Sequence, residues 1–354
     1  MPTSLFLDLA KQGLRMPVGT DLILHETADP EGAKYDATLL GAVVARAAER
    51  YHTPLAFPLM DLTLEKADLL EFVGVAAAAT DQFHFEEAPD LHTVSAVIHA
   101  AERPFPPRIQ ANQGAVRYIA EKTKLVAVGM AIGPFSLMTK LVSDPISPVA
   151  MAGSGVTAEE DASVCLVERC LALAEATVLR SIRAQIEAGA RAIILCEPAA
   201  NTVYLSPRQL RAGSRIFEQF VLAPNRRVRD LLRSYDVDLI FHDCGSLTTE
   251  MVRLFGEELQ PAMISLGGSR KLWEDAAVVS KRIVLYGNLP TKMFYSDSEM
   301  PVEEVRRLTE ETVREMTACG HPHILGSECD VLHVPDAAAT IREKVDVMVG
   351  QWVV

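Results

Sequence analysis

Positive charge is scarce in this sequence. Its 354 residues include 34 Lys and Arg against 47 Asp and Glu, so the formal net charge is −13 and the pI lies near 5.2. Nucleic-acid binding depends on clustered Lys and Arg that neutralise phosphates, and membrane-surface binding depends on a basic amphipathic segment. The composition therefore predicts a protein that binds neither nucleic acid nor a membrane.

Long hydrophobic runs and abundant cysteines are also missing. The apolar stretches 190–198 and 237–245 are far shorter than the roughly 20 residues that cross a bilayer. The first residues do not show the basic segment, apolar core and cleavage site of a secretory signal. Six cysteines in 354 residues are too few for a secreted disulfide scaffold. We therefore expect a soluble, cytoplasmic protein whose cysteines are reduced.

Phosphate-binding and serine-hydrolase motifs are missing as well. The glycine-containing turns 133–135 and 286–288 and the pair Gly267-Gly268 match neither a G-x-G-x-x-G fingerprint nor a P-loop. No G-x-S-x-G sequence marks a nucleophile elbow. These absences leave no support for a dinucleotide site, an ATP site or a Ser-His-Asp triad.

What the sequence does contain is an alternation of short apolar runs with longer amphipathic segments. The runs are apolar on both faces, as in parallel strands that helices cover, and they lie at 52–61, 124–133, 190–198, 237–245, 261–268, 282–288 and 323–330. Helix-like segments include 156–190, 206–235 and 301–320. This order predicts an α/β fold in which residues 1–354 form one domain, a (β/α)8 TIM barrel over 51–354 after an N-terminal helical extension over 1–50.

Chemically unusual residues follow the apolar runs. Those at the C-terminal end of a run are Asp61, Gly133-Pro134, Glu197, His242, Cys244, Gly287-Asn288 and Cys329. Enzymes with parallel barrels build their active sites at that end, from the loops that join strands to helices. Packing alone gives no reason for this placement. The pattern therefore predicts an active site at the C-terminal mouth of the barrel.

His242 and Cys244 form the strongest local signal for metal chemistry. If residues 237–244 are the end of a strand, these side chains point to the same side. Imidazole nitrogen and thiolate sulfur are both good Zn²⁺ ligands, and Cys329 at the end of another run supplies a third. Three protein ligands would leave a tetrahedral zinc one open position, as in catalytic sites. The alternative is a buried cysteine beside a hydrogen-bonded histidine, because an H-x-C pair alone is not specific.

Other candidate residues have plainer alternatives. Asp61 ends an apolar run, where a buried carboxylate is costly unless it is paired or functional, but it could also cap the helix that begins near Thr63. Cys165 and Cys170 fall inside an amphipathic segment, so we expect them to pack in the core. Core packing is a less clear expectation for Cys196, because its neighbour Glu197 should face the opposite side of the strand.

Eight segments spread along the chain carry a family resemblance. They are RMPVGTD (15–21), PLMDLTLEKAD (58–68), IGPFSL (132–137), CEPAAN (196–201), LSPRQL (205–210), FHDCG (241–245), LYGNLP (285–290) and GSECDVLHVPDAA (326–338). In them the chain resembles the uroporphyrinogen decarboxylase superfamily, and within it the zinc-dependent corrinoid methyltransferases typified by methylcobamide:coenzyme M methyltransferases. The H-x-C pair with a distant cysteine marks that branch. The family fold is a (β/α)8 barrel, which agrees with the strand pattern.

The resemblance implies that His242, Cys244 and Cys329 bind Zn²⁺. It further implies methyl transfer between a corrinoid (cobalamin) and a small methyl donor or acceptor, which we expect to be a thiol. The corrinoid would be carried by a separate small corrinoid-binding protein that docks over the barrel mouth. Coordination to zinc would remove the proton of a thiol while its sulfur stays nucleophilic. The expected proton-handling or substrate-orienting residues are Asp61, Glu197, Tyr204 and Asn288, with Glu197 also a candidate fourth zinc ligand.

Two departures from the family pattern bear on the substrate. The decarboxylases carry an Arg-rich R-Q-A-G-R-Y segment that binds substrate carboxylates, whereas the corresponding region here reads RMPVGTD with Arg15 alone. Many relatives have an Asp where this chain has Gly267 and Gly268. The alternatives to a methyltransferase are a metal-free, decarboxylase-like lyase acting on another carboxylated substrate and a non-catalytic partner of a corrinoid protein. The sequence leaves the direction of methyl transfer open.

Overall fold

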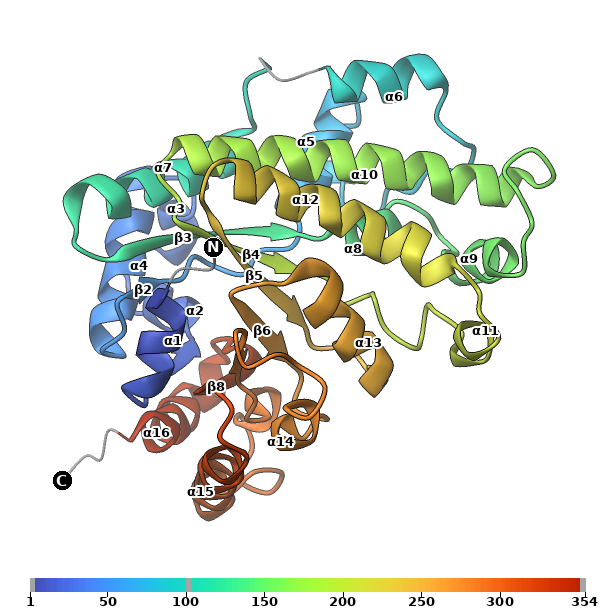
Figure 1. Cartoon of the computed structure of the whole chain (residues 1–354). Helices are drawn as coiled ribbons and strands as arrows, with labels where there is room; N and C mark the ends of the chain where they lie inside the picture. The colour runs from blue at the N-terminus through green and yellow to red at the C-terminus, as the bar shows by residue number, and fades with distance from the viewer. Residues whose placement is uncertain (1–3, 100–102, 351–354) are drawn as a thin grey trace.

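An all-parallel sheet of eight strands lies at the centre of the computed structural model, which describes residues 4–99 and 103–350 (Figure 1). The strand order is β1-β8-β7-β6-β5-β4-β3-β2. The strands are β1 (Arg15–Val18), β2 (Leu55–Ala56), β3 (Val126–Ile132), β4 (Ala192–Cys196), β5 (Asp238–Asp243), β6 (Met263–Leu266), β7 (Val284–Tyr286) and β8 (His323–Asp330). Each predicted apolar run contains one of β2 to β8, so the predicted α/β barrel fold is confirmed. The predicted domain also includes residues 1–3, 100–102 and 351–354, which lie outside the described residues.

The two end strands of this order, β1 and β2, meet at a seam. No ladder joins them within residues 4–99 and 103–350. Side chains bridge the seam instead. The Thr20 hydroxyl donates to the backbone carbonyl of Phe57 at 2.6 Å, and the Thr53 hydroxyl contacts Met16 Sδ at 3.1 Å. The two edges of the sheet are therefore held together here by side chains rather than by backbone pairing.

The predicted helical extension is wrong at Arg15–Val18, which form strand β1. This strand pairs with β8 and places Met16 and Val18 in the interior of the barrel. It was hidden because it has four residues, one of them Pro17, and a proline suits only the edge or the start of a strand. The rest of the extension is helical as expected, in α1 (Ser4–Lys11), α2 (Thr20–Leu24), α3 (Pro30–Ala33) and α4 (Ala37–Arg50).

Helices cover the outside of the sheet, and α10 and α12 run side by side over its central strands (Figure 1). The predicted helical segments contain α10 (Ala162–Glu187), α11 (Pro207–Arg211), α12 (Ala223–Ser234) and α15 (Val302–Cys319). The other helices are α5 (Leu64–Phe72), α6 (Leu91–Ile98), α7 (Pro107–Lys122), α8 (Pro134–Thr139), α9 (Ile146–Gly153), α13 (Thr249–Leu254), α14 (Leu272–Asp275) and α16 (Ala338–Val349).

Local sequence sets the ends of these helices. The Asp161 side chain accepts hydrogen bonds from the backbone amides of Ser163 and Val164 at the start of α10. Helix α15 begins directly after Pro301 and ends at Gly320, whose φ of 62° is the left-handed conformation that favours glycine. The start and stop signals read from the sequence at 301–320 therefore correspond to the observed helix.

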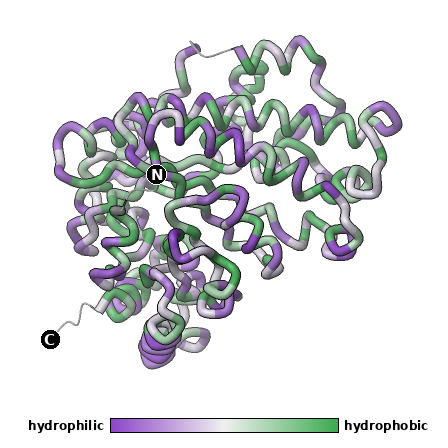
Figure 2. The backbone as a smooth tube through the Cα atoms, in the orientation of Figure 1, coloured by the Kyte–Doolittle hydropathy of each residue, from purple (hydrophilic) through white to green (hydrophobic). Residues whose placement is uncertain are grey.

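Apolar side chains pack on both faces of the sheet. Inside the barrel, Phe6 and Leu9 of α1 pack with strand residues such as Ile240 and Val284, so α1 closes the end opposite the mouth. On the outer face, a larger core joins the strands to the helices, and along the helices hydrophobic residues alternate with hydrophilic ones (Figure 2). None of the helices in the described ranges has the length and apolarity that crossing a membrane requires.

Candidate metal centre

His242 lies at the C-terminal end of β5, and Cys244 directly follows the last residue of this strand. His242 is level with Cys196 of β4 in the strand register, and Cys196 belongs to the core inside the barrel. Because side chains alternate along a strand, His242 points into the barrel and Cys244 follows on the same side. Cys329 comes from the end of β8. The barrel therefore brings three predicted ligands from two non-adjacent strands to one mouth.

The ligand atoms of His242, Cys244 and Cys329 lie within 4.8 Å of one another. His242 is buried, and the two cysteines are half-buried. Nδ1 of His242 lies 2.8 Å from the Ser265 hydroxyl, whereas Nε2 is buried and has no hydrogen-bond partner in the described part of the chain. An orphaned imidazole nitrogen beside two sulfurs fits Zn²⁺, which nitrogen and sulfur donors bind with tetrahedral geometry.

The two thiols hold their protons unequally. The pKa of Cys244 is lowered, chiefly because Cys329 donates a hydrogen bond to its sulfur and further because His242 lies beside it, although burial acts in the opposite direction. The same hydrogen bond and burial raise the pKa of Cys329. One sulfur of the pair is therefore held as a thiolate, which is the form of cysteine that binds a metal.

Lys292 is a neighbour of this site that the sequence analysis did not single out. It lies in the short 3₁₀ helix Thr291–Met293, in the loop after β7. Burial lowers the pKa of Lys292, but the negative charge shared by the Cys244–Cys329 pair and the charge of Glu328 outweigh burial, so the pKa lies above its usual value. An ammonium group here offsets the charge on the sulfurs. The sequence gives one indication that Lys292 belongs to the site, namely its position shortly after Asn288, in a loop at the mouth.

Met60 and Ser265 are two further neighbours that the sequence analysis missed. Cys329 Sγ lies 3.8 Å from Met60 Sδ, and Ser265 is the hydrogen-bond partner of His242. Met60 directly precedes Asp61, the residue that the sequence singled out in this loop. A thioether or a hydroxyl in an apolar run carries no distinctive signal, so these contacts become visible only in the fold.

Glu197 lies on the other face of the sheet from the three ligands. Its buried carboxylate accepts hydrogen bonds from the backbone amides of Phe135 (3.1 Å) and Ser136 (2.8 Å) at the start of α8, and from the Asn225 amide (2.9 Å). Burial raises the pKa of Glu197, and these hydrogen bonds oppose the shift. Neither of its oxygens belongs to the group of close ligand atoms. Its roles in proton handling and as a fourth zinc ligand stay predictions.

Asp61 and Tyr204 lie in loops at the mouth and are held by neighbours. The Asp61 carboxylate accepts hydrogen bonds from the backbone amide (3.1 Å) and the hydroxyl (2.5 Å) of Thr63 and pairs with Arg108 at 3.2 Å. The hydrogen bond from the Thr63 amide resembles a helix cap, which is the alternative role given above for Asp61, because α5 begins at Leu64, directly after Thr63. Tyr204 packs edge-on against Phe135, with ring centres 6.3 Å apart. Catalytic roles for Asp61 and Tyr204 stay predictions.

Asn288 fixes the loop that follows β6. Its side-chain amide donates to the backbone carbonyls of Gly267 (2.7 Å) and Arg270 (2.9 Å). A Cβ atom at Gly267 would lie 2.6 Å from the carbonyl oxygen of Cys244, so the loop approaches the site closely only because this residue is glycine. The contacts of Asn288 therefore support Cys244 through the loop, and a direct role with substrate stays a prediction.

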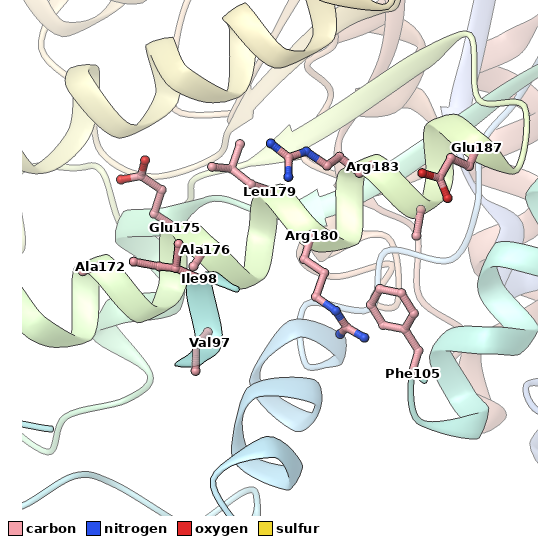
Figure 3. Close-up of a pocket in the computed structure, with 11 residues that line it drawn as sticks. Val97, Ile98, Phe105, Ala172, Glu175, Ala176, Leu179, Arg180, Arg183 and Glu187 are labelled. Carbon is pink, nitrogen blue, oxygen red and sulfur yellow. The ribbon is translucent and has the colours of Figure 1, made fainter. Parts of the chain in front are cut away.

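A pocket of about 370 Å³ lies away from this centre, on the outer face of α10 (Figure 3). Val97 and Ile98 of α6 line one side, and Phe105 lines another. The Arg180 guanidinium lies 3.6 Å from the centre of the Phe105 ring and pairs with the buried Asp68. These contacts hold helices together, and the described residues that line the pocket do not belong to the group of close metal-binding side chains. The candidate site is therefore at the barrel mouth.

Comparison with known proteins agrees with this geometry. The family described as uroporphyrinogen decarboxylase (URO-D) matches residues 33–347. Two curated relatives are named methylcobamide:CoM methyltransferase MtbA: one from Methanosarcina acetivorans is 26% identical over 146 residues, and one from Methanosarcina mazei is 28% identical over 136 residues. These alignments cover 39% and 38% of this chain and only 38% and 35% of the two relatives, little more than a third of their length.

The fold also matches a solved structure. A methyltransferase from Methanosarcina mazei superposes with a TM-score of 0.68, and the match covers 99% of this chain and 97% of that chain. Sequence identity over the match is 18%, so the likeness concerns the fold alone. It agrees with the barrel built from β1 to β8.

Proposed function

The chain belongs to the uroporphyrinogen decarboxylase family, and from that premise we propose that it is a zinc-dependent methyltransferase acting between a corrinoid protein and a small molecule, a thiol. The observation that carries the proposal is the group of His242, Cys244 and Cys329, in which an orphaned imidazole nitrogen lies beside two sulfurs. The relatives named methylcobamide:CoM methyltransferase support it, because that name joins a methylated corrinoid to coenzyme M.

In this proposal, Nε2 of His242 and the sulfurs of Cys244 and Cys329 hold one Zn²⁺. Bound there, zinc lets a thiol lose its proton near neutral pH while its sulfur stays nucleophilic. Three protein ligands leave one position for the sulfur of the substrate, as in catalytic zinc sites. The ammonium group of Lys292 offsets the negative charge that an incoming thiolate adds.

Four further residues complete the proposed site. Asn288 holds the glycine loop against Cys244, and Glu197 fixes the start of α8. Asp61 and Tyr204 lie in loops at the same mouth, where we assign them substrate orientation and proton handling. The fourth zinc ligand in the resting protein is a water molecule or Glu197, and the latter would have to leave its present hydrogen bonds.

The corrinoid partner would approach the same mouth. Val203, Tyr295 and Leu332 are exposed large hydrophobic residues in the loops after β4, β7 and β8. Contiguous exposed apolar surface favours a protein partner, and we propose that these three loops form the surface on which a small corrinoid-binding protein docks. All six cysteines are free, which favours the reducing cytoplasm as the compartment.

Methyl transfer from methylcobalamin to a small thiol tests this function. We expect the spectrum to change from methyl-Co(III) to Co(I), at a rate that rises as zinc is returned to the metal-free protein. If thiols fail while methyl ethers or methylamines transfer their methyl group to Co(I), the protein acts on the donor side. If zinc-loaded protein moves no methyl group in either direction, the proposal is wrong and a decarboxylase-like lyase is the better account.

A further inference from the structure

We propose that Ser265 is a positioning residue that holds the His242 ring in the orientation needed to bind a metal through Nε2. The Ser265 hydroxyl lies 2.8 Å from Nδ1 of His242. Both residues are 2% exposed, so no solvent competes for this hydrogen bond. This inference rests on the proposed metal site and adds to it a residue outside the ligand set.

The sheet itself brings Ser265 to His242. The two residues are register partners on the neighbouring parallel strands β5 and β6. Register partners in a parallel ladder point to the same face, so both side chains enter the barrel at one level. The contact therefore follows from backbone pairing and does not depend on a flexible loop.

The hydrogen bond is compatible with the neutral form of His242 that binds a metal. A neutral imidazole carries a proton on one nitrogen and a lone pair on the other. When Nδ1–H donates to the Ser265 hydroxyl, Nε2 carries the lone pair and faces the sulfurs of Cys244 and Cys329. Nε2 has no other partner within the described residues. The Ser265 hydroxyl can accept this hydrogen bond, so it orients the ring and supports the form in which a histidine binds a metal through Nε2.

A serine at this position also sets the charge of the site. A dication with two thiolates and a neutral imidazole has no net charge, and the hydroxyl of Ser265 leaves that sum unchanged. A carboxylate in place of the hydroxyl would add a negative charge close to the ligands and disfavour a further anion. The neutral Ser265 hydroxyl therefore leaves the site able to take an anionic fourth ligand such as a thiolate.

Zinc affinity and histidine spectroscopy test the positioning role. We expect Ser265→Ala to bind zinc about 10- to 100-fold more weakly in competition with a chromophoric chelator, as for other lost partners of ligating histidines. Ser265→Thr keeps the hydroxyl and should restore most of the affinity. Ser181→Ala removes another buried serine hydroxyl, which bonds Glu65 in the outer layer, and should leave zinc affinity unchanged. Equal affinity in Ser265→Ala and the wild type would overturn the role.

The hydrogen bond can be measured without metal. In ¹⁵N-histidine-labelled, metal-free protein, the Nδ1 signal of His242 should move in Ser265→Ala, because the hydrogen bond at this nitrogen is lost; His242→Gln assigns the signals. An unchanged Nδ1 signal in Ser265→Ala would refute the inference. If the signal moves as expected but the wild type binds no zinc, the proposed function fails, and Ser265 orients His242 without a role in metal binding.

Ser265→Asp tests the charge argument. We expect it to retain zinc but to bind a small thiol on the order of tenfold more weakly, because a like charge then lies near the incoming sulfur. Undiminished thiol affinity in this variant would show that the partner of His242 does not select the ligand charge.

Discussion

Two buried polar groups at the ends of neighbouring strands differ in what surrounds them. Glu197 follows β4 and lies between the sheet and the helices, where both carboxylate oxygens accept hydrogen bonds from the chain's own donors. His242 on β5 points into the barrel, and its Nε2 has no partner among the described residues. A place at a strand end is therefore not enough to mark a site. A group that the fold satisfies supports structure, whereas one left unsatisfied is available to a ligand.

In the outer layer, between the sheet and the helices, a second buried carboxyl group avoids an unpaired charge in a different way from Glu197. Glu65 of α5 is 1% exposed and accepts a hydrogen bond from Ser181 at 2.8 Å. Its other oxygen has no partner among the described residues, and burial raises the pKa of Glu65 to about 7. This carboxyl avoids an unpaired buried charge by holding a proton. At the mouth, by contrast, a thiolate is stabilised by a neighbouring thiol, His242 and Lys292.

Loss of a ligand at the mouth should have the largest effect. Cys329→Ala removes one of three proposed donors, so zinc content should fall from about one per chain to a small fraction. The methyl-transfer rate should fall on the order of 100-fold or more, because even lost partners of ligands cost up to that much. Metal analysis of protein purified without added zinc, with rates measured on the same samples, checks both.

Cys165→Ala is the matched control for this variant. Cys165 is a half-buried cysteine on α10, outside the ligand group. Its replacement should leave zinc content and rate at the wild-type values. Full zinc occupancy in Cys329→Ala would contradict the ligand assignment. It would also mean that the polar groups at the mouth, like those of the outer layer, do not bind a metal.

Glu65→Gln should change how stability depends on pH. The pKa of Glu65 is raised from 4.5 to about 7 in the folded state, so between these values the folded state holds a proton that the unfolded state releases. The free energy of unfolding then falls as pH rises through this window, by about 1.4 kcal/mol per unit and roughly 3 kcal/mol in all. Glutamine does not titrate, so the variant should lack this component.

Urea unfolding at several pH values between 4.5 and 7 measures the difference. The curves of wild type and Glu65→Gln should diverge steadily, with the variant gaining relative stability as pH rises. Parallel pH dependence in the two proteins would mean that Glu65 does not carry the proton. Zinc content should be the same in both, because Glu65 lies in the outer layer.

Glu197→Gln should have a smaller effect on the free energy of unfolding. The variant tests whether Glu197 stabilises the fold or binds zinc. The amide nitrogen of glutamine would face backbone donors such as the Ser136 amide, which now reach a carboxylate oxygen at 2.8 Å. Leaving such a buried donor unsatisfied costs about 1–3 kcal/mol, which urea unfolding would detect. Zinc content should be unchanged. A loss of zinc would instead make Glu197 the fourth ligand and break the contrast between Glu197 and His242.

Much of the fold could be predicted because buried parallel strands give continuous apolar runs. β3 to β8 each lie within such a run, and α15 ends at Gly320 as its sequence indicates. β1 could not be predicted, because four residues with an internal proline give no recognisable pattern. Its place is set by pairing with β8, at the other end of the chain.

The proposed ligands could likewise be predicted from the sequence, whereas the residues around them could not. His242 and Cys244 could be singled out because two metal-binding residue types stand two apart at a strand end. Lys292 and Ser265 could not, because what makes them special is a contact across loops or strands. The alternation of side chains did predict that Cys196 and Glu197 face opposite sides, and the fold gives the physical consequence: Glu197 bonds α8 and lies away from the ligands.

Removal of the metal should have the smallest effect on the fold. The three ligands lie at the mouth, whereas separate apolar cores fill the barrel and join the sheet to its helices. Chelated protein should keep its far-UV circular dichroism, unlike zinc fingers, whose folding free energy comes largely from the metal. Its thermal midpoint should fall only as far as the loss of a ligand bound to the native state requires. Loss of the helical signal on chelation would show that the bound metal stabilises the barrel. The contrast between an outer layer whose buried polar groups support the fold and a mouth whose polar groups bind a ligand would then not hold.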